Sequence, residues 1–198
     1  MENFEFLTNN WFIIVGVAVV LIALIYNTLI TKKNRVEKSL SNIDAFLQQR
    51  LDQMENLFIL LDNALDHEAQ VYADISRERT GFNQIKGMYQ SDKTSPAGLV
   101  QADNAMSHFL SGARATFERY PELHAIDTVE KVMAENVQIE TQLNAARRQY
   151  NSNVTLYRNA IQAFPNNIIA SIFRLPNKYE LYRADEEARQ AVRPTRRS

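Results

Sequence analysis

Hydrophobic and polar positions divide the chain into an unbroken apolar run and a longer part with periodic apolar positions. The run, residues 11–30, holds no charged residue, and only Asn27 and Thr28 in it are clearly polar. As a helix it measures about 30 Å, the thickness of a bilayer's hydrocarbon core. Because a helix satisfies its own backbone hydrogen bonds, the run predicts a transmembrane helix. The residues that mark this span are Trp11, Phe12, Gly16, Leu21, Tyr26 and Ile30.

After the run, apolar residues recur at alternating spacings of four and three, which is typical of a helix with a buried stripe. A second ridge that includes Phe46 and Phe58 widens the stripe, which favours a bundle helix over a two-stranded coiled coil. No Pro or Gly lies between Gly16 and Gly81, so one helix over residues 31–86 is predicted. The apolar members of its seam are Val36, Leu40, Ile43, Leu47, Met54, Leu57, Leu61, Ala64, Val71 and Ile75.

The rest of the chain predicts further helices and no sheet, because no stretch alternates with period two. Residues 87–98 predict a loop by their Gly, Pro, Ser and Asp content, with Ser95-Pro96 as the start of the next helix. The fold class expected is all-α: a transmembrane helix continuing into an antiparallel up-down-up bundle of three long helices plus a short C-terminal helix. After helix 31–86 the expected segments are helices 96–119, 121–164 and 166–174. The expected domains are an external segment 1–10, the span 11–30, the bundle domain 31–175 and a charged, flexible tail 176–198.

The net charge of −1 conceals two basic stretches, one beside the apolar run and one in the tail. The first is expected to contact anionic lipid headgroups, and by the positive-inside rule it places residues 32–198 in the cytoplasm and Met1 outside. A periplasmic bundle is the alternative. A cleaved signal peptide fits less well, because no Lys or Arg precedes Trp11 and no small-residue cleavage site follows the run. The headgroup-binding residues expected are Lys32, Lys33, Arg35 and Lys38.

Several polar residues fall on seam positions where apolar residues are expected. An unpaired buried charge costs several kcal/mol, so these residues must be paired or face water. If the first and third long helices run parallel, with Val36 level with Glu122, Arg50 lies about one turn from Glu140, and the two are expected to form a buried bridge. A wet edge of the stripe and a ligand-binding or catalytic cluster are the alternatives. The polar seam positions are Arg50, Glu68, Asn136, Glu140 and Arg147.

The sequence shows no arrangement typical of an enzyme, a cofactor site or a metal site. The pair His67-Glu68 lacks the second His, one turn later, of a helical zinc motif, because position 71 is Val. No Cys is present, which excludes disulfides and thiolate ligands. Gly-rich phosphate loops and nucleophile elbows are also missing. We expect no catalytic residues, cofactor, metal, small-molecule substrate or nucleic-acid partner.

Several short motifs resemble those of the LemA family over most of residues 26–175. The opening motifs are Asn34-Arg35, Ile43-Asp44, Arg50-Leu51-Asp52 and Asn56-Leu57; His67-Glu68 follows, and Tyr150-Asn151, Val154, Tyr157, Ile161, Phe164-Pro165 and Ile169-Ala170 close the pattern. The chain departs from the family at Glu55, where a Pro is usual, and at Tyr157-Arg158, where a second Tyr-Asn pair is usual. The resemblance implies a bacterial, single-span membrane protein with a helical-bundle domain and no established enzymatic activity.

These observations favour a non-enzymatic protein of the bacterial cytoplasmic (inner) membrane that works by binding, as a scaffold, an adaptor or a self-assembling organiser. Its expected partners are the bilayer and copies of itself, since heptad-like stripes can be shared between subunits. Residues 168–175, Ile168 to Leu175, and the basic tail are candidate contacts for a protein partner or for lipid. A signalling subunit that transmits a partner or ligand signal through the continuous anchor helix is the alternative.

Overall fold

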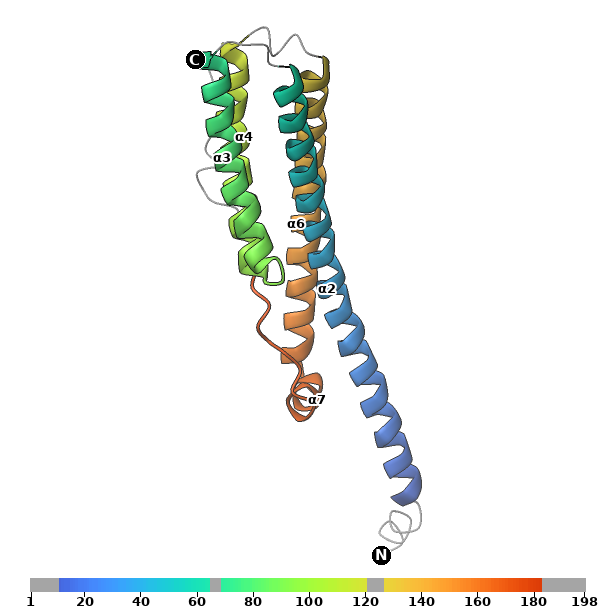
Figure 1. Cartoon of the computed structure of the whole chain (residues 1–198). Coiled ribbons are helices and arrows are strands. Elements are labelled where there is room, and N and C mark those ends of the chain that lie inside the picture. The colour runs from blue at the N-terminus through green and yellow to red at the C-terminus, as the bar shows by residue number, and fades with distance from the viewer. Residues whose placement is uncertain (1–10, 65–68, 121–126, 183–198) are drawn as a thin grey trace, which may run out of the picture. The chain divides into compact units, whose positions relative to one another are not determined.

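The computed structural model describes residues 11–64, 69–120 and 127–182, and every described element is helical. Figure 1 shows these helices along the chain. Their bounds are α2 Trp11–Ala64, α3 Ala69–Asp92, α4 Pro96–Arg119, α6 Asp127–Gln162 and α7 Asn166–Ile172. The all-α prediction is therefore confirmed for the part of the chain that the structure describes. By its contacts the chain divides into two units, to both of which α2 and α6 contribute.

The unit formed by residues 40–149 and 180–198 contains a four-helix arrangement. Phe82 lies beside Phe109 and Glu78 accepts a hydrogen bond from Thr116, so α3 and α4 run antiparallel, side by side in Figure 1. Arg147 of α6 pairs with Asp103 near the start of α4, while Arg114 near the end of α4 lines one groove with Val129 near the start of α6. The helices α4 and α6 are therefore also antiparallel. The topology here is up-down-up-down, and the expected up-down-up arrangement of three long helices was wrong in its helix count.

The difference arises because the expected helix over residues 31–86 is two helices, α2 and α3. The Nζ of Lys86 lies 2.7 Å from a carboxylate oxygen of Glu55, and the phenol of Tyr89 donates to Asp44 over 2.6 Å. Contacts between residues so far apart in sequence require α3 to run back along α2. When the chain reverses, two amphipathic helices bury their apolar stripes against each other. The stabilisation comes from tertiary packing, which local helix propensity does not predict.

The boundary between α3 and α4 also differs from the prediction. α3 continues through Gly87 to Asp92, so the loop is shorter than the expected residues 87–98. Ser95 caps α4 as predicted, because its Oγ accepts the backbone N–H of Gly98 at 2.9 Å. A Cβ at Gly98 would approach the carbonyl oxygen of Asp92 to 2.0 Å. Only glycine therefore fits this close approach between the loop and the helix start.

The unit formed by residues 1–39 and 150–179 has a core of aromatic and aliphatic side chains. Tyr157 donates a hydrogen bond from its phenol to the carbonyl of Pro176 at 2.9 Å, and Asn153 donates to the carbonyl of Arg35 at 3.3 Å. Tyr179 donates to a Glu37 carboxylate oxygen at 2.8 Å, and this bond, with Lys33, holds the pKa of Glu37 below its usual value. The buried apolar residues of this unit are Leu29, Val36, Tyr150, Val154, Tyr157, Ile161, Ile169 and Ala170.

The short helix α7 ends in a left-handed residue. The N–H of Leu175 donates to Ala170 at 2.9 Å and the N–H of Arg174 to Ser171 at 3.2 Å, which is the bond pattern of a Schellman motif. Arg174 has a φ of 50°, a conformation that glycine adopts readily and that costs an arginine about 1 kcal/mol or more. An arginine therefore stands where backbone conformation alone favours glycine.

Candidate functional site

In the unit formed by residues 40–149 and 180–198, four charged side chains are buried or partly buried among apolar residues. Arg50 from α2 is only 4% exposed, and Asp103 from α4 is fully buried. Arg147 and Glu140, both from α6, retain side-chain exposures of 11% and 33%. We call these four residues the charge network. Because buried charges are costly unless paired, their mutual geometry decides whether the network stabilises the fold.

Each carboxylate of the charge network contacts both arginines. Arg50 lies 2.9 Å from Glu140 and 3.6 Å from Asp103. Arg147 lies 3.2 Å from Glu140 and forms a second ion pair with Asp103. The formal charges cancel, and α2, α4 and α6 each contribute at least one member. The network therefore joins three helices with matched charges.

Tyr182 closes one side of the charge network. Its phenol oxygen lies 2.6 Å from Oδ2 of Asp103 and 3.2 Å from the carbonyl oxygen of Leu99. The guanidinium of Arg147 lies over the Tyr182 ring, with its central carbon 5.7 Å from the ring centroid, a cation–π distance. Tyr182 is itself buried. The expected flexible tail from residue 176 was therefore wrong for this residue, which packs against α4 and α6.

The pKa values in the charge network depend on two opposing effects: burial disfavours the charged forms, and ion pairing favours them. Burial raises the pKa of Asp103 above its usual value, although Arg147, Tyr182 and Arg50 oppose the shift. Burial also lowers the pKa of Arg50, against the attraction of Glu140 and Asp103. Burial would lower the pKa of Arg147 too, but Asp103 and Glu140 outweigh it and the net shift is upward. Burial and the neighbouring Asp103 raise the pKa of Tyr182, so its phenol stays protonated and donates.

The charge network is suited to fixing helix register and poorly suited to chemistry. Its carboxylates are occupied by guanidinium groups and by Tyr182, so neither is free to act as a base on a substrate. Among residues 11–64, 69–120 and 127–182, no group of three or more His, Asp or Glu side chains is arranged to hold a metal ion. The arrangement can hold three helices in one alignment.

The residues predicted for the polar seam have different outcomes. Arg50 and Glu140 do form an ion pair, but α2 and α6 run antiparallel, so the parallel alignment from which the pair was inferred was wrong. Antiparallel order is shown by Gln53, which donates to Glu135 at 3.0 Å while Arg50 reaches Glu140. Arg147 joins the same network. Glu68 lies outside the described residues, as does His67.

Asn136, the remaining polar seam residue, lies apart from the charge network. Its side chain is buried and donates to the carbonyl of Val132 at 3.0 Å and toward the sulfur of Met54 at 3.8 Å. The bond to the Val132 carbonyl, one helical turn earlier, satisfies an N–H of the Asn136 amide without a charged partner. Asn136 is therefore a separate polar contact between α6 and α2.

Asp103 and Tyr182 were missed by sequence reasoning. Asp103 follows Leu99 by four residues and precedes Met106 by three, so the same four-three spacing that selected Arg50 points to it. The neighbouring Ala102 fits the same apolar stripe, so the spacing alone does not single out Asp103. Tyr182 lies in a stretch of mostly charged residues, and that composition predicts a flexible tail. An aromatic residue in such a stretch was the available sign of a buried contact.

The residues predicted to span the membrane form the first part of α2. In this part the helix is long and apolar enough to cross a bilayer. Trp11, Phe12, Gly16 and Leu21 are exposed, whereas Tyr26 and Ile30 are partly covered. Exposed apolar side chains on so many successive residues are unusual for a surface in water. The predicted headgroup residues follow on the same helix, where Arg35 and Lys38 are exposed and Lys32 and Lys33 are half-buried.

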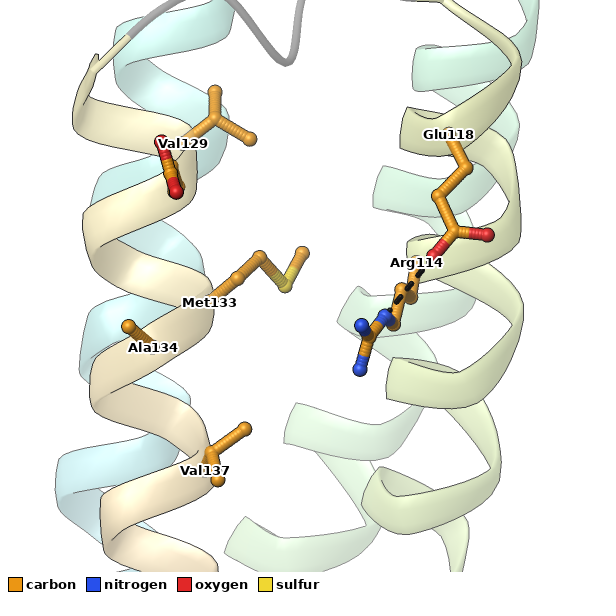
Figure 2. A pocket seen from close by; sticks show the side chains of 7 residues that line it. Arg114, Glu118, Val129, Met133, Ala134 and Val137 are labelled. Carbon is orange, nitrogen blue, oxygen red and sulfur yellow. Dashed lines mark hydrogen bonds and ion pairs between the residues drawn. The ribbon is translucent and has the colours of Figure 1, made fainter.

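A groove with a cavity of about 220 Å³ lies between α4 and α6, in the unit formed by residues 40–149 and 180–198. Figure 2 shows Met133 and Val137 of α6 directed toward α4, where Arg114 and Glu118 form an ion pair at 3.1 Å. Val137 is 62% exposed although it is aliphatic. The groove thus combines an apolar wall from α6 with a charged rim from α4. Its lining residues are Arg114, Glu118, Val129, Glu130, Met133, Ala134 and Val137.

The chain is similar to three curated magnetosome proteins. Magnetosome proteins MamQ 1 and MamQ 2 of Paramagnetospirillum magneticum are each 27% identical to it over 165 residues. Magnetosome protein MamQ of Magnetospirillum gryphiswaldense is 23% identical over 165 residues. Each alignment covers 74% of this chain and 61% of the relative, so the chain spans about six tenths of the relatives' length.

A family assignment rests on a longer match. The sequence profile of the LemA family covers residues 39–194, which include α3, α4, α6, α7 and all four members of the charge network. This match agrees with the resemblance found in the short motifs, and it extends through the segment that supplies Tyr182. The chain belongs to the LemA family.

Proposed function

We propose that this chain is a membrane-anchored scaffold, held in the bilayer by the first part of α2 and binding proteins through the groove between α4 and α6. The observation that carries the proposal is the pairing of an exposed apolar wall from α6 with a charged rim from α4. Interaction surfaces commonly combine an apolar centre with a polar rim. The chain then acts by contact and not by catalysis.

The size of the groove favours a protein side chain over a small molecule as its occupant. Its volume of about 220 Å³ is smaller than the roughly 300–1,000 Å³ typical of small-molecule sites. Val137 also projects into solvent, which suits a partner that covers the groove from outside. The MamQ relatives are named as magnetosome proteins, and their names state no reaction. That is compatible with a scaffold.

The anchor part of the proposal rests on α2. Its first part is apolar and exposed, and the helix continues without a break to Ala64. The four basic residues after Ile30 suit an anionic headgroup layer, where each contributes about 1 kcal/mol. The proposal places the span in the cytoplasmic membrane, with the bundle on the cytoplasmic side.

Cross-linking from a single cysteine tests the groove, because the natural chain has no cysteine. A Val137→Cys variant, carrying a thiol-attached photoreactive group, is expected to give discrete adducts in native membranes. Ser76→Cys, on the exposed side of α3, is the matched control and is expected to give none. Mass spectrometry of the adducts separates a second copy of the chain from another protein. If Val137→Cys is fully labelled and still gives only monomer without adducts, the proposal is contradicted.

A further inference from the structure

The helix α7 and the residues beside it expose large apolar side chains. Phe164 is 79% exposed and Ile172 is 69% exposed, and about half the surface of Ile168 and of Phe173 is also open. On the opposite side of α7, Ile169 and Ala170 are buried. The helix is therefore fixed to its unit by one face and presents an apolar face outward. Such a face in water is unfavourable, so something of matching chemistry is expected to cover it.

The position of α7 along α2 identifies what covers that face. The ring of Phe173 lies against the ring of Tyr26, with centroids 4.6 Å apart, and both residues belong to the same unit. Tyr26 precedes the last residue of the apolar run, Ile30, by four positions, which is about 6 Å along a helix. If residues 11–30 span the bilayer, α7 therefore lies at the boundary between the acyl chains and the headgroups.

Exposed basic side chains follow this level along the chain. Arg35 and Lys38 on α2 and Arg174 and Lys178 after α7 are all exposed. Glu37, an acidic residue between Arg35 and Lys38 on α2, is held by Lys33 at 3.1 Å and by the phenol of Tyr179. Arg174 takes a left-handed conformation that favours glycine, so backbone conformation does not account for an arginine here, whereas a contact made by its charge does. Apolar side chains flanked by cations are the pattern of a segment that lies in a membrane interface.

We propose that α7 is a second membrane contact, whose exposed apolar face inserts at the acyl–headgroup boundary of an anionic leaflet beside the α2 anchor. This inference rests on the proposed function in one respect, namely that α2 crosses the bilayer. The apolar face of α7 then continues the lipid-facing surface of α2, and Arg174 and Lys178 contact the phosphates. The anchor becomes a two-point attachment that limits rotation of α2 about its own axis.

Depth-dependent fluorescence quenching of the full chain tests this placement. In a Trp11→Phe background, which leaves no other tryptophan, Ile172→Trp reports on α7. Vesicles of phosphatidylcholine and phosphatidylglycerol carry bromine either near the glycerol or deep in the acyl chains. We expect Ile172→Trp to lose fluorescence more to the shallow bromines than to the deep ones. Tyr72→Trp, at a site of similar exposure on α3 and outside the groove, is the matched control and is expected to be unaffected.

A further variant separates this inference from the anchor on which it depends. Val20→Trp, in the middle of the apolar run, is expected to be quenched mainly by the deep bromines. Quenching of Val20→Trp together with none of Ile172→Trp overturns the role of α7 and leaves the anchor standing. Absence of quenching at both sites overturns both. A third outcome is that bromine does not quench Ile172→Trp, but its emission changes when the protein is diluted in lipid. That result assigns the apolar face of α7 to a contact with a second copy and overturns the membrane contact.

The charge component has its own readout. Arg174→Gln is expected to shift the Ile172→Trp quenching profile toward weaker quenching in anionic vesicles and to have no effect in vesicles of phosphatidylcholine alone. A uniform effect in both vesicles contradicts a contact between Arg174 and the anionic headgroups.

Discussion

Replacing Arg50 with Met is expected to lower the free energy of unfolding by about 3–5 kcal/mol, the cost of breaking a buried ion pair from one side. The variant leaves Asp103 and Glu140 sharing Arg147, so the buried charges no longer cancel. Glu140 is only partly exposed and Asp103 is fully buried, so water replaces little of what Arg50 supplied. Denaturant unfolding of the full chain in detergent micelles, followed by circular dichroism, measures the change.

Two further variants separate charge pairing from other effects of the substitution. Arg50→Met combined with Glu140→Leu restores neutrality and is expected to recover a large part of the loss, giving a coupling energy above about 1 kcal/mol. Arg114→Met, in the exposed pair with Glu118, is the control and is expected to change stability by at most about 0.5 kcal/mol. Additive losses in the double variant would show that the Arg50–Glu140 pair is not coupled.

Replacing Phe58 with Ala is expected to destabilise the bundle by about 3–5 kcal/mol, as is usual for deletion of a buried aromatic side chain. Phe58 lies 5.5 Å from Phe82 and 6.3 Å from Phe109 between ring centroids. These three rings come from α2, α3 and α4, so one side chain supports the contacts of all three helices. The same unfolding measurement applies, with the helical signal of the folded protein checked first.

The control for Phe58 is Tyr72→Ala on α3, because that ring is largely exposed. An exposed aromatic loses little apolar burial, and the change is expected to stay within about 0.5 kcal/mol. Equal effects of Phe58→Ala and Tyr72→Ala contradict the reversal of α3 against α2, since in an uninterrupted helix over residues 31–86 the rings of Phe58 and Phe82 cannot meet.

The periodic pattern identified the buried seam well because burial follows helix geometry directly. Ile43, Leu47, Met54, Leu57 and Leu61 are all buried as the four-three spacing requires. The bounds of α4, Pro96–Arg119, also agree with the expected 96–119, since Ser95 and Pro96 give local start signals. The buried face of a single helix, and a helix start marked by local residues, could therefore be predicted from the sequence alone.

Relations between helices were harder, because periodicity says which face is buried and not which neighbour buries it. The charge network illustrates this limit: Arg50 and Glu140 were selected as a pair, but through a parallel alignment that the structure replaces with an antiparallel one. The reversal between α2 and α3 carries no Pro or Gly within residues 65–68. Phe164 continues the apolar spacing of the preceding residues but is exposed, because α6 ends at Gln162 and the helical periodicity ends with it.

The sidedness of two single cysteines decides whether one helix crosses a membrane and continues into the bundle. Asn9→Cys precedes the apolar run, and Ala45→Cys lies at an exposed position of α2 beyond it. A maleimide that cannot cross membranes is applied to right-side-out and to inverted vesicles. We predict that the two cysteines react from opposite sides, Ala45→Cys from the cytoplasmic one. Reaction of both from the same side would contradict a membrane-spanning α2.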